Sequence, residues 1–170
     1  MNIDEHLTAV RRHARTAPVD VAAVARELGV PIVYEDLDDD IAGAIRQSKT
    51  APNAYEIIVN IGHAETRQRF TIAHELGHFI YHRDLLGQGT GDTRAYRAEP
   101  GTGFANPHIT AREERQASAF AANLLMPMAL ISEFQARGVR SAALLAQIFN
   151  VSEAAMRIRL GLPQTAMAQA

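Results

Sequence analysis

Apolar residues recur at helical spacing along the first thirty positions of the chain. A short amphipathic helix is predicted over residues 3–14, where the apolar positions are three or four apart and fall on Leu7, Val10 and Ala14. A second helix is predicted after Pro18, with one apolar face formed by Val21, Val24, Ala25 and Leu28. Gly29 is suited to end that helix. Residues 1–30 are therefore expected to form two N-terminal helices.

Three short runs rich in β-branched and apolar residues follow, at residues 32–35, 41–47 and 55–60. An acidic run separates the first two, and a polar stretch with Pro52 separates the last two. Such segments are typical of turns between strands. Residues 31–60 are therefore predicted to form a small three-stranded sheet.

The helical period returns after these strands. Long helices are predicted over residues 64–82 and 111–126, and Pro127 stops the second one. Between them, residues 84–110 contain five of the eleven glycines and are predicted to form a long loop that shapes or gates a cleft. The C-terminal segment, residues 129–162, is expected to hold three shorter helices at 129–137, 141–149 and 152–160.

These elements together predict the α+β class, with helices around a short sheet in one domain that spans residues 1–170. Hydrophobic residues make up 47% of the chain and charged residues 21%, which is ordinary for a globular protein. Because the chain has no cysteine, a disulfide framework, a thiol nucleophile and a cysteine metal site are excluded. The net charge of −2 excludes a polybasic protein that binds nucleic acids or membrane surfaces.

Targeting signals are not evident in the sequence. The N-terminus is charged and lacks the apolar core of a signal peptide. The most apolar stretch, residues 117–131, is interrupted by Ser118, Asn123 and Pro127 and is too short to span a bilayer. We therefore expect a soluble, cytoplasmic protein with no membrane partner.

The strongest chemical motif is His74-Glu75-Leu76-Gly77-His78, a match to H-E-x-x-H. On a helix the two histidines share one face with Cβ atoms about 6 Å apart, so both can reach one Zn²⁺ at about 2.0–2.1 Å. Glu75 is rotated by about 100° around the axis and is suited to accept a proton from a zinc-bound water. Two surface histidines on a charged helix are the alternative. The flanking residues argue against it, because they are apolar and predict a buried helix: Phe70, Ile72, Ala73, Leu76, Phe79 and Ile80.

A catalytic zinc site needs a third protein ligand and one open position. The candidates are His82, His63, His108, Glu113 and Glu114. His82 continues the four-residue spacing, but about 12 Å of helix separates positions 74 and 82. One ion therefore cannot bind His82 together with both motif histidines. His82 either supports a ligand from beside the site or has a structural role.

Glu113 and Glu114 both lie at the start of the helix predicted over residues 111–126. Glu114 extends the apolar stripe of Ala117, Ala121 and Leu125, and a carboxylate on such a stripe is unfavourable unless it is paired or metal-bound. Both glutamates also suit a helix N-terminus, where the dipole favours negative charge. The helical period does not exclude Glu113, so the residues alone leave both open.

Two segments resemble the signature of the ImmA/IrrE family of zinc metallopeptidases. Residues 69–78 contain the zinc motif, and residues 114–127 are similar to the family pattern E-x-x-A-N-x-F-A-x-x-L-L-M-P. Ser118 departs from the usual Asn of that pattern. The resemblance implies a small, zincin-like (gluzincin) fold with one Zn²⁺ per chain. It also implies the site residues: Glu75 as the catalytic base, and the zinc ligands His74, His78 and Glu114.

The resemblance implies a function as well. Family members cleave helix-turn-helix repressors of phages, mobile elements, stress regulons or toxin–antitoxin systems. We therefore expect a zinc-dependent endopeptidase that acts on such a repressor. His82, Glu113 and Tyr81 are candidates to support the site from beside the ligands, although Tyr81 is equally suited to core packing.

Two other functions fit parts of the sequence. Residues 144–152, followed by Ala155 and Met156, resemble a helix-turn-helix. The second helix offers only Arg157 and Arg159, whereas non-specific DNA affinity needs several phosphate contacts. We therefore favour a structural or partner-docking helix pair and expect no direct DNA binding. The other alternative is a non-catalytic protein that sequesters a repressor or a toxin, and the intact Glu75 argues against it because a pure binder needs no base.

Overall fold

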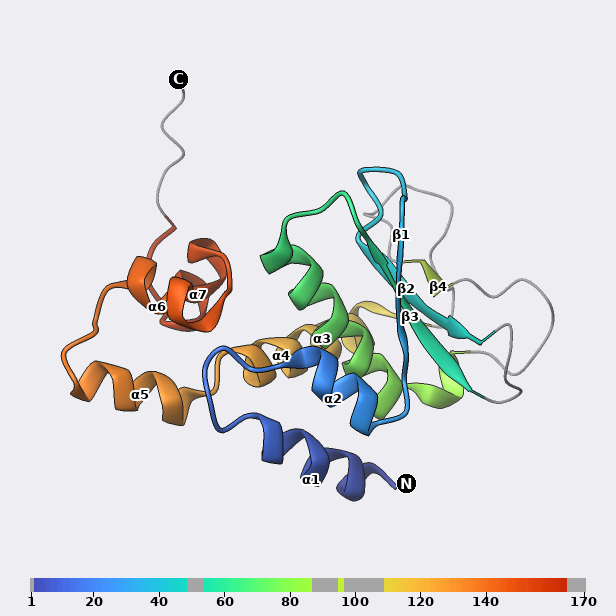
Figure 1. Cartoon of the computed structure of the whole chain (residues 1–170), viewed down its shortest axis with the longest axis horizontal. Coiled ribbons are helices and arrows are strands. Elements are labelled where there is room, and N and C mark those ends of the chain that lie inside the picture. The colour runs from blue at the N-terminus through green and yellow to red at the C-terminus, as the bar shows by residue number, and fades with distance from the viewer. Residues whose placement is uncertain (1, 49–53, 87–94, 97–108, 165–170) are drawn as a thin grey trace.

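The computed structural model describes residues 2–48, 54–86, 95–96 and 109–164. Figure 1 shows a mixed α+β fold, as predicted, with α3 at its centre, the sheet on one side and α5 to α7 on the other. The elements in chain order are α1 (Ile3–His13), α2 (Val21–Glu27), β1 (Ile32–Glu35), β2 (Gly43–Gln47), β3 (Tyr55–Asn60), α3 (Glu65–Tyr81), the 3-10 helix η1 (Arg83–Leu85), β4 (Ala95–Tyr96), α4 (Ala111–Leu125), α5 (Met128–Ala136), α6 (Ala142–Phe149) and α7 (Glu153–Arg159). That these elements form one domain stays a prediction.

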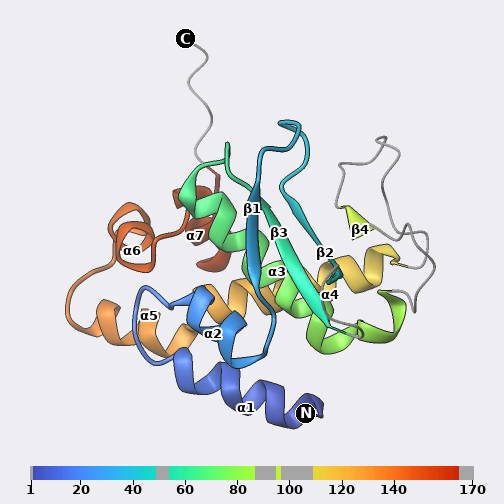
Figure 2. The same cartoon turned by 45° about the vertical axis from the view of Figure 1, so that its right-hand side comes forward.

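The sheet has the strand order β1-β3-β2-β4 (Figure 2). β1 pairs in parallel with β3, and β2 pairs antiparallel with both β3 and β4. The three predicted strands are present. The fourth, β4, is a two-residue strand inside the segment that was predicted to be a loop over residues 84–110. Most of that segment lies outside the described residues, so its predicted gating role stays a prediction.

A buried ion pair links the strands on one side of the sheet. Arg46 on β2 donates from Nε to Glu56 Oε1 on β3 at 2.6 Å, and from Nη2 to Glu35 Oε1 on β1 at 3.0 Å. Arg46 and Glu56 are direct partners in the strand register, and their side chains are only 9% and 12% exposed. Because a buried charge is unfavourable without a partner, each side chain depends on the other.

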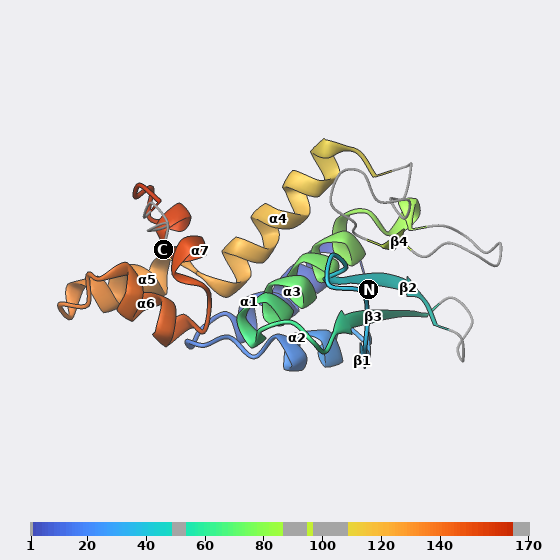
Figure 3. The same ribbon diagram turned by 90° about the horizontal axis from the view of Figure 1, so that it is seen from above.

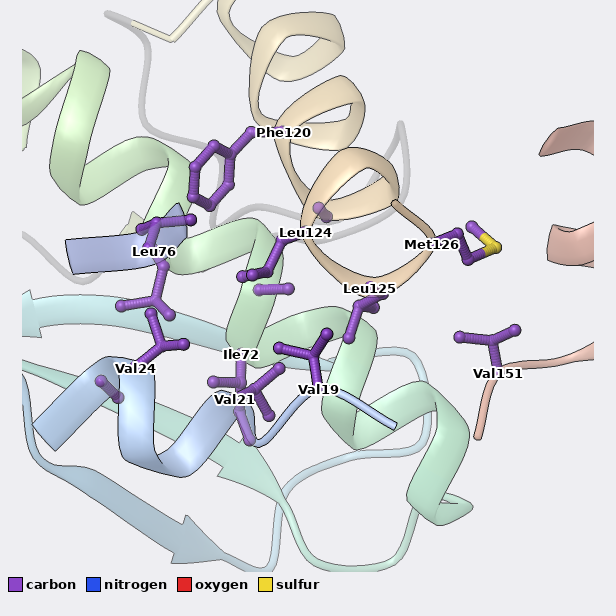
Figure 4. Close-up of a cluster of buried hydrophobic side chains, with 14 of the residues drawn as sticks. Val19, Val21, Val24, Ile72, Leu76, Phe120, Leu124, Leu125, Met126 and Val151 are labelled. Atoms are coloured by element: carbon purple, nitrogen blue, oxygen red, sulfur yellow. The ribbon is translucent and has the colours of Figure 1, made fainter. Parts of the chain in front are cut away.

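The core forms where α3 meets the sheet, the N-terminal helices and α4. All positions of α3 from Thr71 to Ile80 are buried. Figure 4 shows side chains from α2, α3 and α4 meeting in one apolar cluster, among them Val24, Ile72, Leu76 and Leu124. Burial of such side chains supplies the main favourable term in folding. The H-E-x-x-H motif therefore lies on the best-buried helix of the described chain.

Arg69 at the start of the core-facing part of α3 ties distant segments to this helix. Its Nη2 donates to the carbonyl of Val19 at 2.8 Å, and its Nε donates to the carbonyl of Asn150 at 3.1 Å. Asn150 ends α6 with a left-handed φ of 50°, and its side chain donates to Glu65 on α3 at 2.6 Å. The C-terminal helices are thus anchored to the helix that carries the motif.

The segment Ala111–Ala136 is long and apolar enough to cross a membrane by length and composition alone. It is longer than the apolar stretch expected from the sequence. In the structure it forms two helices, because α4 ends at Leu125 and Pro127 begins α5. Ala117, Ala121 and Leu125 are fully buried in the protein interior. The position of this face in the core accounts for the apolarity of α4.

Candidate metal centre

The site depends on the close crossing of α3 and α4, which lie side by side in Figure 3. Gly77 is at the contact. A Cβ added there would lie 3.0 Å from Ala117 Cα and 3.2 Å from Ala117 O, both backbone atoms of α4. Glycine therefore allows a close approach at this point, and a larger residue would require α4 to shift by a few tenths of an ångström. Glu114 lies three residues before Ala117, so the crossing brings its carboxylate to the motif histidines.

His74, His78 and Glu114 offer ligand atoms that all lie within 4.8 Å of one another. The two Nε2 atoms of the histidines are 2.9 Å apart. Glu114 Oε2 is 3.3 Å from His74 Nε2, and Glu114 Oε1 is 3.4 Å from His78 Nε2. Ligands about 2.0–2.1 Å from a tetrahedral Zn²⁺ are separated from each other by about 3.3–3.4 Å. Both distances from Glu114 match this value, and the two histidine nitrogens are about 0.4–0.5 Å closer than it. A metal ion therefore fits between the three residues after a small separation of the histidine rings.

Because two of the three side chains are buried, their acceptor atoms need a partner other than bulk water. The side chain of His74 is fully buried and that of His78 is 4% exposed, whereas that of Glu114 is 34% exposed. Two buried imidazoles and a partly exposed carboxylate converge on one point, so several acceptor atoms lie together where water reaches them only from the Glu114 side. A cation between them satisfies these acceptors, which is the chemistry expected of a metal site.

Glu75 lies beside the cluster on the same helix, and its residue is 3% exposed. Its position follows His74 by one residue, so it projects about 100° away around the helix axis. Among the described residues, no hydrogen bond or ion pair of the Glu75 side chain is found. The carboxylate is therefore available to accept a proton, which a general base requires.

The second nitrogen of each histidine has its own partner. His78 Nδ1 lies 3.1 Å from His82 Nδ1, and His82 Nε2 lies 3.2 Å from Oε1 of Gln116 on α4. Ser118 Oγ lies 3.4 Å from His74 Nδ1. Burial lowers the pKa of His82, which favours its neutral form. Of the two roles considered for His82, the structure therefore favours contact with a ligand.

Glu113, the competing carboxylate, lies at the helix cap. Its Oε2 accepts from the backbone N of Thr110 at 3.0 Å and from the Thr110 hydroxyl, which completes a capping box at the start of α4. The Thr110 hydroxyl bond is the main cause of the lowered pKa of Glu113. Glu113 is therefore absent from the ligand cluster found among the described residues.

The remaining candidates lie apart from the cluster or outside the described residues. Tyr81 packs edge-on against Phe120 with ring centroids 5.8 Å apart, in agreement with a packing role. A ring nitrogen of His63 lies 2.9 Å from the carbonyl O of Asp39. His108 lies outside the described residues.

Sequence reasoning missed three features of the site. Gly77 was quoted only as part of the motif, although the close approach of α4 depends on it. Gln116 gave no signal, because its contact with His82 spans 34 positions of the sequence. Ser118 did give a signal, since it departs from the family pattern, and the structure places it against His74.

Comparison with known proteins agrees with this geometry. The family model Peptidase_M78, described as IrrE N-terminal-like domain, matches residues 25–161. A solved structure described as a Mycobacterium tuberculosis transcriptional regulator superposes with a TM-score of 0.60 at 19% sequence identity. The match covers 98% of this chain and 49% of that regulator, so the chain spans about half its length and shares its fold. No curated protein matches the chain significantly.

Proposed function

The chain belongs to the Peptidase_M78 family of IrrE N-terminal-like domains, and from this we propose that it is a zinc-dependent endopeptidase. The observation that carries the proposal is the convergence of His74, His78 and Glu114 beside Glu75. Family membership alone is compatible with a peptidase-like protein or a regulator. The intact ligand set together with an available carboxylate supports the peptidase.

The three residues suit zinc by their chemistry as well as by their spacing. Two imidazoles and one carboxylate form a common ligand set of catalytic zinc sites, which keep a fourth position open. Bound there, zinc supplies Lewis-acid polarisation of a peptide carbonyl and lowers the pKa of a bound water. Two of the ligands, His74 and His78, are buried in the protein, whereas the more exposed Glu114 marks the side open to solvent.

Glu75 is the residue proposed to move protons. Its carboxylate accepts a proton from the attacking water and returns it to the nitrogen of the leaving amine. An uncharged amide at this position would keep the shape of the side chain and lose the base. Glu75 is only 3% exposed, so its carboxylate is largely removed from bulk water, which strengthens its electrostatic interactions.

We further propose that the substrate is a helix-turn-helix transcriptional repressor, in a phage, mobile-element, stress or toxin–antitoxin circuit. The resemblance to the ImmA/IrrE family supports this substrate class. The similar fold of a protein described as a transcriptional regulator is compatible with it.

Direct DNA binding by this chain has less support. Arg157 on α7 donates to Glu153 at 3.2 Å and to the carbonyl of Pro163 at 2.9 Å. Arg159 donates to the carbonyl of Met126 at 3.0 Å, and burial lowers its pKa. Both arginines of the helix-turn-helix-like segment are therefore used in contacts within the chain, in line with a structural helix pair.

A reporter assay tests the proposal against sequestration of the repressor. A helix-turn-helix repressor encoded beside this gene would be co-expressed with wild-type protein or with Glu75→Gln. We expect the wild type to relieve repression and to produce repressor fragments. We expect Glu75→Gln to do neither while retaining its zinc. Equal relief by the variant, with intact repressor, would show that binding and not proteolysis is the mechanism.

A further inference from the structure

A row of three polar side chains leads from the metal centre to the exposed surface of α4. It starts at His78, passes through the buried His82 and ends at Gln116. Each step is within hydrogen-bond distance, at 3.1 Å between the two histidine Nδ1 atoms and 3.2 Å between His82 Nε2 and Gln116 Oε1. The donor and the acceptor of each contact can be assigned in turn, starting from Gln116.

The amide oxygen of Gln116 can only accept a hydrogen bond. His82 must therefore carry its hydrogen on Nε2 to make this contact, and the Nδ1 of a neutral His82 is then an acceptor. The hydrogen between the two Nδ1 atoms must consequently belong to His78. With its hydrogen on Nδ1, His78 presents a lone pair on Nε2, the atom that faces His74 and Glu114.

We propose that His82 and Gln116 are positioning residues that hold His78 in the tautomer required for metal binding. The opposite tautomer would point an N–H at the ion and could not ligate it. Partners of this kind around metal-bound histidines orient the ring and raise its basicity, and their loss typically lowers metal affinity by about 10–100-fold.

The other histidine is supported differently. Ser118 Oγ lies 3.4 Å from His74 Nδ1, and a hydroxyl can either donate or accept a hydrogen bond. Ser118 is therefore compatible with both tautomers of His74 and selects neither. The two histidines therefore differ: the neighbouring groups select one tautomer of His78 and do not select a tautomer of His74.

The row also links the ligands to the position of α4. Gln116 follows Glu114 by two residues, so a shift of the first turns of α4 moves a ligand and the end of the row together. Gln116 also lines a surface hollow of about 480 Å³, between α1, the end of α3 and α4. The outer end of the row is thus open to substitution without disturbance of the buried core.

Zinc affinity measured by competition with a chromophoric chelator tests the proposal. Gln116→Leu, which cannot accept a hydrogen bond, is expected to lower affinity by up to about tenfold, since Gln116 contacts His82 and not a ligand directly. Gln116→Glu, which can only accept, is expected to retain or increase it. The matched control is Gln147→Leu, the same change at an exposed position of α6, which is expected to leave affinity unchanged. Equal affinities for Gln116→Leu and wild type would overturn the proposal.

Long-range ¹H–¹⁵N NMR of the imidazole rings in zinc-free wild-type protein gives an independent result. We expect hydrogen on Nδ1 of His78 and on Nε2 of His82, and we expect the Gln116→Leu variant to show mixed tautomers. Hydrogen on Nε2 of His78 in the wild type would overturn the proposal. The inference rests on the proposed metal site and not on peptidase activity. Failure to cleave any peptide, with the expected tautomers and affinities, would refute only the peptidase.

Discussion

Replacing Gly77 with alanine tests whether the close crossing of the two long helices creates the metal centre. The new Cβ would lie 3.0 Å from Ala117 Cα and 3.2 Å from both Ala117 O and Phe120 Cδ1. Because non-bonded carbon atoms prefer about 3.5–4.0 Å, the neighbouring atoms of α4 must give way by a few tenths of an ångström. Overpacking of this kind costs about 1–3 kcal/mol, and the better helix propensity of alanine recovers about 0.8–1.0 kcal/mol.

The net loss of stability of zinc-free protein is therefore expected to be about 0–2 kcal/mol. Zinc affinity should fall, because Glu114 moves with α4 away from the two histidines. Chemical denaturation of zinc-free protein measures the first quantity, and chelator competition measures the second. Ala119→Gly on the exposed side of α4 is the control, since it costs about 1 kcal/mol of helix propensity and should leave zinc affinity unchanged. A Gly77→Ala protein with wild-type zinc affinity would refute the account of the crossing.

Three further predictions concern the ligands and the sheet. Glu114→Ala should abolish stoichiometric zinc in metal analysis. Glu113→Ala should keep zinc and lower stability slightly, because it removes one half of the capping box. The reverse order would move the ligand to Glu113. Ser118→Asn should raise zinc affinity in chelator competition, because an amide oxygen accepts more strongly than the distant hydroxyl; reduced affinity would contradict this. Arg46→Met should destabilise the protein by about 3–5 kcal/mol in thermal or denaturant unfolding, because it leaves Glu56 buried without its partner. Arg46→Met combined with Glu56→Leu should recover most of the loss, and no recovery would count against a buried-charge cause.

The hydrophobic period predicted the helices and three strands of the fold well. Leu7 and Val10 lie on the packed side of α1, and the buried run from Thr71 to Ile80 agrees with the apolar residues around the motif. β4 could not be predicted, because its two residues follow no period and depend on pairing with β2. The ion pair of Arg46 and Glu56 was equally invisible, since it requires the register of two strands.

Local spacing and the family resemblance together predicted the candidate ligands of the site, but not the residues that contact those ligands. The four-residue spacing placed His74 and His78 on one face, and the resemblance selected Glu114 over Glu113, in agreement with the cluster in the structure. The contacts around the ligands depend on how α3 and α4 cross. Gln116 and Ser118 touch histidines 34 and 44 positions away, and no local pattern contains such contacts.

The central claim is that this chain hydrolyses peptide bonds with Glu75 as the base at a site built from His74, His78 and Glu114. The most direct test is mass spectrometry of a proteome-derived peptide library after incubation with wild-type protein or Glu75→Gln, both at equal measured zinc content. The account predicts new peptide termini with the wild type, their loss on chelation, and none with Glu75→Gln. Equal cleavage by the variant, or no cleavage by the zinc-loaded wild type, would contradict it.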